Sequence, residues 1–339
     1  MDRPIVALVM AGGTGTRLYP ASSADRPKQF LSFGGERSLL ARTVDRCSFA
    51  DEVLVSTTED LLDGVRERAP DADVLVEPVP KDTGPALTYA TFWCRELLGD
   101  CVVLAVPNDH VIGDGFADTA RRAAKVAVRT RDLVTFGVDP DRPATEYGYV
   151  EPGAEREDHY AVEAFHEKPD RETAADRVDA GWYWNAGIFA WTPDAFLSAA
   201  ADSALAPMLD ALEADDPARG FREVEAVSVD YAVLERTAGR DDGPGVVLVP
   251  ADFDWDDLGS WDALARVLDA DADGNVALGE GLTLDAADNV IASDGTHVSV
   301  VGAEDLVVAA FGDRVLVVPK DEAQRVREVV AELRQEGRF

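Results

Sequence analysis

The fold is decided by the stretch Val9-Met10-Ala11-Gly12-Gly13-Thr14-Gly15-Thr16-Arg17-Leu18, which is followed closely by Arg26-Pro27-Lys28-Gln29-Phe30-Leu31. The residues from Ile5 to Ala11 form a short apolar run that is typical of a buried strand. Glycines directly after a strand let backbone N–H groups approach an anion at the strand's carboxyl end, and Arg17 and Lys28 add two cations. The stretch therefore predicts a βα unit that binds phosphate groups.

Two familiar glycine motifs do not fit this loop. A Walker loop ends in Gly-Lys followed by Ser or Thr, whereas Gly15 is followed by Thr16-Arg17. A dinucleotide-binding loop needs a third glycine where this chain has Leu18. Because glycines are also common in ordinary βα turns, the loop indicates a phosphate site only in combination with the cations that follow it.

Strand-like and helix-like segments alternate through the first half of the chain, as in α/β proteins. The expected strands are Ile5–Met10, Val53–Ser56, Val74–Val76, Val102–Val106 and Leu133–Val138. One connecting helix is expected from the apolar spacing of Phe116, Ala120, Ala123, Ala124 and Ala127. The pattern predicts a mostly parallel, Rossmann-like sheet that binds ligands at the carboxyl ends of its strands. Gly12-Gly13 and Asn108-Asp109 both follow strands, so we expect them at the same edge of the sheet.

The character of the chain changes after Trp261. A helical segment around Ala263–Leu268 leads into the acidic, turn-prone stretch 269–274, which we interpret as a domain boundary. The predicted large domain covers residues 1–265, and a small β-rich domain covers residues 275–339. The short strands expected in the small domain are Val290–Ala292, Val298–Val301, Leu306–Phe311 and Val315–Val318. A final helix is expected at about 322–336, with Val326, Val329, Val330 and Leu333 on one face.

The composition limits the possible partners and locations. The chain has 65 acidic and 32 basic residues and a net charge of −33, which excludes nucleic acid as a partner on electrostatic grounds. The apolar run near the start is too short for a secretion signal or a membrane span. We therefore expect a cytoplasmic protein without a membrane partner. The cysteines Cys47, Cys94 and Cys101 lack the spacing of a zinc site or a disulfide framework and are expected in the core.

Arginine replaces lysine almost everywhere in this chain. The lysines are Lys28, Lys81, Lys125, Lys168 and Lys320. Together with the acidic surplus, this usage is similar to that of proteins from salt-loving archaea, so we expect a halophilic source and a solvated acidic surface. No carboxylate is therefore assigned a function on its charge alone.

The glycine loop, Arg17 and the segment Pro27-Lys28-Gln29-Phe30-Leu31 resemble the signature of the nucleotidyltransferases that make nucleotide sugars. The Lys-Gln-Phe-Leu ending resembles the mannose-1-phosphate guanylyltransferases. Further motifs in the same order extend the resemblance from about residue 5 to 262, and more loosely to about 318. The resemblance implies a GT-A-like α/β catalytic domain followed by a small β-helix-like domain. It also implies that GTP and α-D-mannose 1-phosphate react to give GDP-mannose and diphosphate.

The resemblance assigns the phosphate and metal residues. The backbone of Gly12 and Gly13 is implied to bind the nucleotide phosphates. Arg17 is implied to steady the departing diphosphate, and Lys28 to neutralise charge at the reacting phosphates. Asp109 and Asp257 are the implied ligands of Mg²⁺, a cation that prefers one or two carboxylates together with phosphate oxygens.

The neighbours of the two metal-binding candidates leave other readings open. Asp109 follows the strand 102–106, where an aspartate also commonly caps a helix or stabilises a turn. Asp257 is chosen because Asp257-Leu258-Gly259-Ser260-Trp261 resembles the family's Asp-x-Gly-Ser-Trp segment. Asp254 and Asp256 are then expected to be surface acids, and His110 to be structural.

Three segments resemble the sugar-binding parts of the family. They are Glu146-Tyr147-Gly148-Tyr149-Val150, Phe165-His166-Glu167-Lys168-Pro169 and Trp182-Tyr183-Trp184-Asn185-Ala186-Gly187. Lys168 is implied to hold the sugar phosphate, while Gly148, Glu167 and Asn185 contact sugar hydroxyls. The aromatic residues of the third segment and its continuation, Trp182, Trp184, Phe189 and Trp191, are assigned mostly to packing. The later segment Ser228–Glu235 is expected to be mainly structural.

The segment Pro80-Lys81-Asp82-Thr83-Gly84-Pro85-Ala86 resembles the part of the family that faces the nucleotide, although Asp82 and Gly84 depart from its usual Asn-Thr-Ala-Pro-Ala. Asp82 and Thr83 are the implied nucleotide-binding residues. The Asp82 carboxylate could accept hydrogen bonds from guanine N1–H and N2–H₂. It could equally cap the helix that starts near Pro85.

Other functions fit the same fold. The nearest alternative is a nucleotidyltransferase that uses glucose 1-phosphate with UTP or dTTP. A non-catalytic regulatory or assembly subunit is an alternative of another class, but it should have lost phosphate or metal residues, and Arg17, Lys28, Asp109 and Asp257 are all present. A structural protein with a β-solenoid tail would not explain the glycine loop. The sequence does not decide the oligomeric state, and a homodimer is one arrangement that it allows.

Overall fold

The computed structural model describes residues 3–13, 15–23, 26–33, 35–240 and 243–339, so Thr14 of the glycine loop lies outside the described residues. The chain forms two compact units. Unit 1 comprises Met1–Gly12, Val44–Pro107 and Gly113–Trp255, and unit 2 comprises Gly13–Thr43, Asn108–Ile112 and Asp256–Phe339. The predicted boundary at residues 265–275 gives two domains that are each continuous in sequence. Unit 2 instead also contains two segments from the amino-terminal part of the chain.

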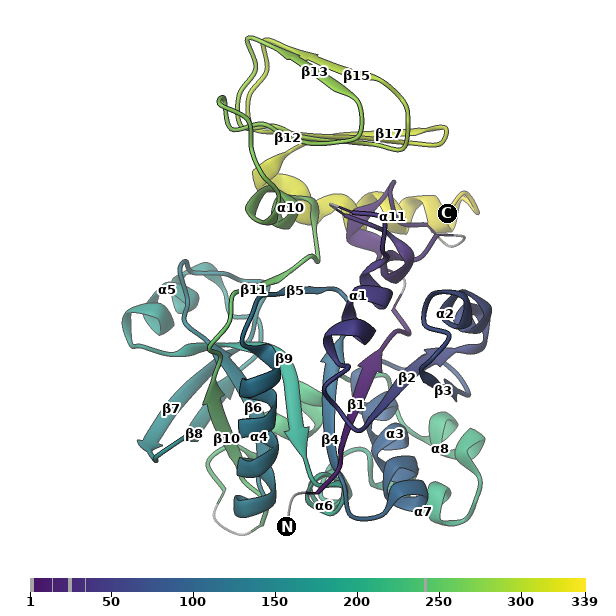
Figure 1. Ribbon diagram of the computed structural model, residues 1–339, viewed down its shortest axis with the longest axis vertical. Helices are drawn as coiled ribbons and strands as arrows, with labels where there is room; N and C mark the ends of the chain where they lie inside the picture. The colour runs from purple at the N-terminus through teal and green to yellow at the C-terminus, as the bar shows by residue number, and fades with distance from the viewer. Residues whose placement is uncertain (1–2, 14, 24–25, 34, 241–242) are drawn as a thin grey trace. The chain divides into compact units, whose positions relative to one another are not determined.

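Unit 1 is built on a nine-stranded sheet of order β3-β2-β1-β4-β9-β6-β10-β8-β7 (Figure 1). Its strands are β1 (Ile5–Met10), β2 (Glu52–Thr58), β3 (Asp73–Glu77), β4 (Val102–Pro107), β6 (Leu133–Val138), β7 (Tyr149–Glu155), β8 (Tyr160–His166), β9 (Tyr183–Trp191) and β10 (Val246–Pro250). β1 pairs in parallel with β2 and β4, and β10 with β6. β9 is antiparallel to both β4 and β6. The mostly parallel α/β class is confirmed, and each of the five predicted strands is present.

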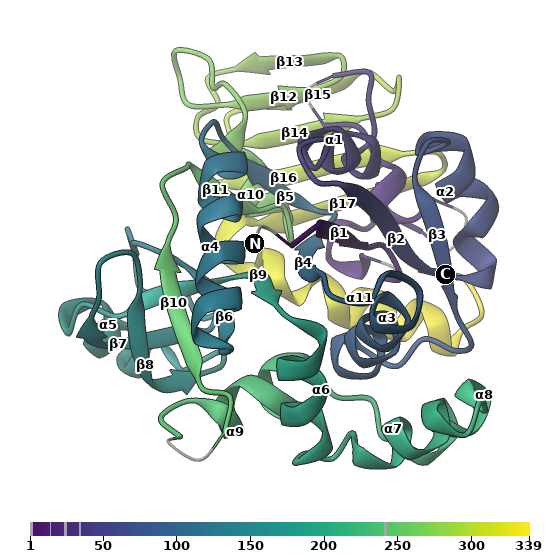
Figure 2. The same cartoon turned by 60° about the horizontal axis from the view of Figure 1, so that its bottom comes forward.

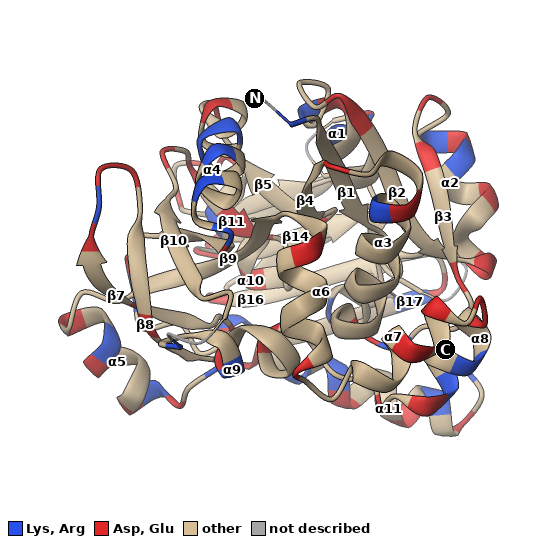
Figure 3. Ribbon diagram, turned by 90° about the horizontal axis from the view of Figure 1, so that it is seen from below, with Lys and Arg blue, Asp and Glu red and all other residues tan. Residues whose placement is uncertain are grey.

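Helices cover both faces of this sheet. They are α2 (Leu62–Arg68), α3 (Thr83–Leu98), α4 (Phe116–Thr130), α5 (Arg171–Asp179), α6 (Pro193–Ala201), α7 (Ala206–Glu213), α8 (Pro217–Glu223) and α9 (Glu235–Thr237), while α1 (Leu39–Arg46) spans a boundary between the two units along the chain. Val6 and Leu8 of β1 share a buried cluster with Leu87 of α3 and Phe196 of α6. The alternate residues of β1 are buried as well, as expected for a strand covered on both faces. Figure 3 shows α4 and α6 on opposite sides of the strands.

Two further predictions about the core of unit 1 are confirmed. The five residues that predicted a helix lie on α4, and all of them are buried. The three cysteines are buried and free. Met10 of β1 is paired with Pro107 of β4, so these two strands end together at the edge of the sheet where the sequence predicted ligand binding.

Unit 2 contains a β-helix-like domain. Outside that domain, unit 2 contains β5 (His110–Ile112), α10 (Trp261–Val267) and most of β11 (Trp255–Asp257), whose first residue belongs to unit 1. The carboxyl-terminal elements are β12 (Val276–Leu278), β13 (Gly281–Leu284), β14 (Val290–Ser293), β15 (Val298–Val301), β16 (Leu306–Phe311), β17 (Arg314–Pro319) and α11 (Val326–Gln335). β12, β14 and β16 pair in parallel, as do β13 and β15 (Figure 2). The predicted short strands are confirmed.

Asparagine side chains connect successive turns of this small domain. Asn275 Nδ2 donates to Ala286 O at 2.9 Å, and Asn289 Nδ2 donates to Ala303 O at 3.0 Å. Asn289 Nδ2 also lies 2.9 Å from Asn275 Oδ1. This repeat of the same contact satisfies buried backbone groups at the corner of each turn.

The carboxyl-terminal helix is shorter than predicted, because residues 320–325 form a 3₁₀ segment before α11 begins. Val326 and Val330 are buried, but Val329 is 42% exposed, so its assignment to the apolar face was wrong. The buried face follows the spacing i, i+4 and i+7, and Val329 lies at its solvent-facing edge. Among the described residues, we find no helix with the length and apolar character that crossing a membrane requires.

Candidate functional site

The phosphate cluster, which we define as Arg17, Lys28, Asp109 and Asp257, lines one cavity of about 250 Å³ within unit 2. All four residues were predicted as phosphate or metal residues from the sequence. Lys28 is only 5% exposed although it carries a charge. A lysine is buried in this way only when anionic partners compensate for its lost hydration.

The glycine loop makes room for Lys28. Gly15 has a backbone φ of +62°, and a Cβ atom at this position would overlap with Lys28 Cβ. Both the left-handed conformation and the close approach require glycine. Thr16–Leu18 then forms a 3₁₀ turn that carries Arg17, and Lys28 begins a second such turn directly after Pro27.

Lys28 connects the two predicted metal ligands. Lys28 Nζ lies 2.6 Å from Asp109 Oδ2 and 3.7 Å from Asp257 Oδ1. Burial acts to raise the pKa of Asp109, but the charges of Lys28 and His110 outweigh it and hold the pKa at about 2. The Leu258 N–H donates to Asp109 O at 3.2 Å, which ties the two aspartate segments together. Both carboxylates therefore belong to one charged cluster.

The cluster fits a divalent cation. One ligand atom from each of Asp109, His110 and Asp257 lies within 4.8 Å of the others. Asp257 Oδ1 is buried and has no hydrogen-bond partner among the described residues, so a cation would satisfy it. The two carboxylates are the oxygen ligands that a hard cation prefers. His110, which the sequence predicted to be structural, is a third potential ligand, with Nε2 3.9 Å from Asp109 Oδ1.

The neighbouring Asp256 differs from Asp257. Arg266 binds Asp256 through two hydrogen bonds, of 2.7 Å from Nε and 2.8 Å from Nη2. This bidentate pairing commits both carboxylate oxygens. The arrangement supports the choice of Asp257 within the acidic motif.

Glu77 in unit 1 is a candidate that the sequence analysis missed. It ends β3 and is buried, and Ser56 Oγ donates to Glu77 Oε1 at 2.9 Å. Burial raises its pKa to about 7, although the Ser56 hydrogen bond acts in the opposite direction. A Cβ atom added to Gly12 would lie 3.5 Å from Glu77 Oε1, so Glu77 lies beside Gly12. The available signal was an acidic residue at the carboxyl end of a predicted strand.

Asp82 caps a helix, which is one of the two roles that the sequence left open. Its Oδ1 accepts from the Thr83 N–H at 2.7 Å at the start of α3, and its φ is +66°. Thr83 Oγ1 accepts from the Val229 N–H at 2.9 Å. Thr83 thus fixes the segment before residue 230.

The sugar cluster, which we define as Gly148, Glu167, Lys168 and Asn185, is also brought together within unit 1. The Asn185 N–H donates to Gly148 O at 2.8 Å. A Cβ atom at Gly148 would meet Glu167 Oε2 and would lie 3.2 Å from Phe165 Cε1, so Glu167 lies directly against Gly148. Lys168 Nζ forms an ion pair with Glu167 Oε1. Lys168 has a φ of +47°, a strained conformation of the kind that is concentrated at functional sites.

Two further observations concern the surroundings of the sugar cluster. The aromatic residues Trp182, Trp184, Phe189 and Trp191 are buried, which confirms their assignment to packing. Asp230, within the segment predicted to be mainly structural, accepts a hydrogen bond from Asn185 Nδ2 at 2.9 Å. It begins the π-helical turn Asp230–Leu234, a type of turn that is frequent at functional sites.

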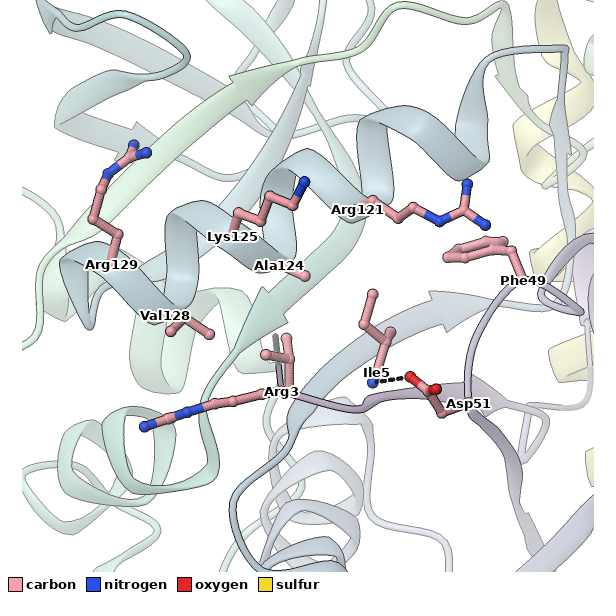
Figure 4. A pocket seen from close by; sticks show the side chains of 10 residues that line it. Arg3, Ile5, Phe49, Asp51, Arg121, Ala124, Lys125, Val128 and Arg129 are labelled. Carbon is pink, nitrogen blue, oxygen red and sulfur yellow. Dashed lines mark hydrogen bonds between the residues drawn. The ribbon is translucent and has the colours of Figure 1, made fainter. Parts of the chain in front are cut away.

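A larger cavity of about 460 Å³ in unit 1 is a weaker candidate for phosphate binding (Figure 4). Of its basic residues, Arg3 pairs with Asp100, Arg129 pairs with Asp158, and Arg121 lies over the Phe49 ring. In Figure 4 Arg3 and Arg129 extend away from Phe49. These guanidinium groups do not converge on one point, unlike the charges of the phosphate cluster.

Comparisons with known proteins identify the family of this chain. Residues 6–274 match the Nucleotidyl transferase family, and residues 279–333 match the MannoseP isomerase/GMP-like beta-helix domain. A mannose-1-phosphate guanylyltransferase of Sinorhizobium fredii is 35% identical over 97% of this chain and 68% of its own length. One from Escherichia coli is 35% identical over 98% of this chain and 75% of its own length.

Solved structures show the same fold. One is the crystal structure of a protein from Thermus thermophilus, described as a mannose-1-phosphate geranyltransferase. It matches with a TM-score of 0.87 and 34% sequence identity, and the match covers 98% of this chain and 99% of that chain. A UDP-glucose pyrophosphorylase complexed with UDP-glucose has a TM-score of 0.55 at 14% identity and covers 78% of this chain and 96% of its own, which shows a shared fold alone. By the extent and identity of these matches, the chain belongs to the nucleotidyl transferase family, among the mannose-1-phosphate guanylyltransferases.

Proposed function

We propose that this chain joins GTP and α-D-mannose 1-phosphate to give GDP-mannose and diphosphate. The names of its relatives support this choice of substrates. The observation that carries the proposal is the phosphate cluster, in which Arg17, Lys28 and two carboxylates line one cavity. Two fixed cations and a candidate metal site are what a reaction between two phosphate-bearing substrates requires.

The reaction needs no nucleophilic side chain. A phosphate oxygen of mannose 1-phosphate attacks the α-phosphorus of GTP in line, and the bond from that phosphorus to the β-phosphate oxygen breaks. Catalysis then consists of positioning the two substrates and neutralising the charge that develops. We assign Lys28 to the reacting phosphates and Arg17 to the departing diphosphate. Lys28 is suited to its role because its surroundings hold it in place before the substrates bind.

We assign Asp109 and Asp257 as the residues that hold Mg²⁺. A bound Mg²⁺ would neutralise phosphate charge and orient the phosphate oxygens. The buried, unsatisfied Asp257 Oδ1 supports this assignment. His110 would then act mainly on the charge state of Asp109, because nitrogen ligands suit Mg²⁺ less well than oxygen ligands.

For the nucleotide, we propose that the backbone N–H groups of Gly12 and Gly13 bind phosphate oxygens. Two carboxylates are candidates for reading guanine, which presents N1–H and N2–H₂ as adjacent donors. Glu77 is supported by its position beside Gly12. Asp82 retains Oδ2 as an acceptor after capping α3, and Thr83 holds the adjoining segment. The substitutions Glu77→Gln and Asp82→Asn distinguish between these two candidates.

For the sugar, we assign Lys168 to the phosphate group of mannose 1-phosphate, and Gly148, Glu167 and Asn185 to its hydroxyls. The alternative of a non-catalytic subunit is disfavoured because the charged residues of the phosphate cluster are all present and Lys28 pairs with both aspartates. We further propose a cytoplasmic location and a homodimer, without nucleic-acid or membrane partners. Cell fractionation and analytical ultracentrifugation test the first two.

A diphosphate-release assay tests the proposed function. Four nucleoside triphosphates are each combined with mannose, glucose and galactose 1-phosphates in the presence of Mg²⁺. The expected result is the highest kcat/KM for GTP with mannose 1-phosphate. A preference for UTP or dTTP with glucose 1-phosphate would contradict the proposal, and no release in any combination would favour the non-catalytic alternative.

A further inference from the structure

The amide of Asn185 is locked in one orientation. The Gly187 backbone N–H, which can only donate, lies 3.1 Å from the atom assigned as Oδ1, so this atom must be the oxygen. Thr135 Oγ1 donates to the same oxygen at 2.8 Å. Both acceptor positions of the amide oxygen are therefore used, and the NH₂ group is directed toward Asp230.

This lock leaves one donor and one acceptor unused side by side. One N–H of Asn185 donates to Asp230 Oδ1 at 2.9 Å, and the second has no acceptor among the described residues. Among the described residues, only the backbone N–H of Asp230 itself acts as a further hydrogen-bond donor to this carboxylate, and no other residue is bonded to Oδ2. A hydroxyl group both donates and accepts, so a single hydroxyl could use both groups at once.

The acidic surroundings of Asp230 are also typical of a ligand-binding site. Burial and the nearby Glu167 carboxylate raise the pKa of Asp230 to about 7, although Lys168 acts in the opposite direction. Two acidic groups placed this close repel each other when both are ionised. Such an arrangement is common where a carboxylate has a role in a binding site.

We propose that Asp230, acting together with Asn185, binds one hydroxyl of the sugar 1-phosphate and so determines which hexose the enzyme accepts. The inference rests on the proposed function only in taking a hexose 1-phosphate as the ligand. Hexoses such as mannose and glucose differ in the direction of one hydroxyl. A site that pairs buried polar groups with a hydroxyl strongly rejects a sugar that cannot make the same bonds.

The test is a cycle between Asp230→Asn and a series of mannose 1-phosphates that each lack one hydroxyl, at C2, C3, C4 or C6. Assays at pH 8 keep Asp230 largely ionised. For the parent sugar, Asp230→Asn is expected to lower kcat/KM at least tenfold, with KM for GTP unchanged. For one analogue, the variant and the wild type should agree within about threefold, because the bond in question is already absent. Glu225→Gln, an exposed carboxylate in the preceding segment, is the matched control and should behave like the wild type.

Two results would overturn the inference: an equal loss for the parent sugar and every analogue, which marks a structural role, or no loss for any sugar. Thr135→Val provides a second variant if Asp230→Asn does not fold, because it leaves the carboxylate in place and removes one bond that orients Asn185. It should show the same dependence on a single hydroxyl. A wild type that prefers glucose 1-phosphate would contradict the proposed function alone, and the cycle on deoxyglucose 1-phosphates would then decide about Asp230.

Discussion

The phosphate cluster of unit 2 and the sugar cluster of unit 1 are organised by different interactions. In the phosphate cluster, a buried Lys28 compensates two carboxylates, and the Asp109 pKa is held at about 2. In the sugar cluster, a neutral amide is fixed by three hydrogen bonds and the nearby Asp230 has a raised pKa. From this difference we propose that the first cluster neutralises phosphate charge, whereas the second recognises the hydrogen-bonding pattern of the sugar.

The largest expected effect is a loss of kcat on substitution of Lys28, whereas substitution of Lys168 should change KM instead. Lys28→Ala should lower kcat by roughly a hundredfold or more, since losing one preorganised charge contact costs on the order of 3 kcal/mol in the transition state. Lys168→Ala should mainly raise KM for mannose 1-phosphate, because Lys168 is assigned to ground-state binding. Steady-state kinetics and circular-dichroism melting on both variants check this. Turnover of a folded Lys28→Ala within about threefold of the wild type would remove Lys28 from the mechanism.

The next effect concerns the metal. Asp109→Asn and Asp257→Asn should each raise the Mg²⁺ concentration needed for half-maximal activity by about tenfold, because each removes a hard anionic ligand and preserves its shape. Asp256→Asn is the control, since Arg266 already binds this carboxylate. A changed Mg²⁺ requirement in Asp256→Asn, with a normal one in Asp257→Asn, would shift the assignment by one residue.

Substitution of Glu77 and of Asp82 decides which of these two carboxylates accepts hydrogen bonds from guanine. If Glu77 accepts from guanine, Glu77→Gln should reduce the preference for GTP over ATP by about tenfold, while Asp82→Asn keeps it. The opposite pattern would assign the base to Asp82. Competition assays with both nucleotides measure this preference directly.

Glu77 should also make stability depend on pH. Its native pKa of about 7 exceeds the ordinary 4.5, so the native state retains a proton that the unfolded chain loses between these values. The stabilising contribution is complete below pH 4.5 and is lost as the pH rises through 7. Relative to the wild type, Glu77→Gln should therefore gain on the order of 1–3 kcal/mol in the free energy of unfolding between pH 4 and pH 8. Urea titrations at the two pH values measure it, and an equal difference at both would show that Glu77 is not buried in its neutral form.

The smallest expected effect is that of any single acidic surface residue on the melting temperature and the activity. Figure 3 shows acidic residues along α2, α5 and α7, and the net charge is −33. Repulsion among these charges is screened as the Debye length falls from about 30 Å at 0.01 M salt to about 3 Å at 1 M. We propose that the surface is a salt adaptation, and the melting temperature and activity should both rise toward molar KCl. A flat or falling melting temperature would contradict this proposal and the halophilic source.

Local patterns predicted much of this structure. The strands β1, β2, β3, β4 and β6, the helix α4 and the small β-rich domain followed from apolar periodicity, which depends on neighbouring residues. The position of β9 between β4 and β6 did not, because strand order depends on pairings between distant segments. The charged residues of the phosphate cluster were found through motifs that carry them within short stretches.

The residues that the sequence missed depend on distant partners. Glu77 acquires its raised pKa from burial and its hydrogen bond from Ser56, 21 positions away. Asp230 meets Asn185 across 45 positions. His110 lies near Asp257 because β5 pairs with β11, which is far away in the sequence. No pattern in a single sequence reports such contacts, although acidic residues at strand ends were a usable signal for Glu77.

The most direct test of the central claim is the stereochemical course at the α-phosphorus. The wild type is given one diastereomer of GTP carrying sulfur at that phosphorus, together with mannose 1-phosphate, and the configuration of the nucleotide sugar is determined by ³¹P NMR. A single in-line attack by the sugar phosphate predicts a sulfur-labelled GDP-mannose whose configuration at the labelled phosphorus is inverted. Retention of configuration would show a covalent enzyme intermediate and would contradict the account.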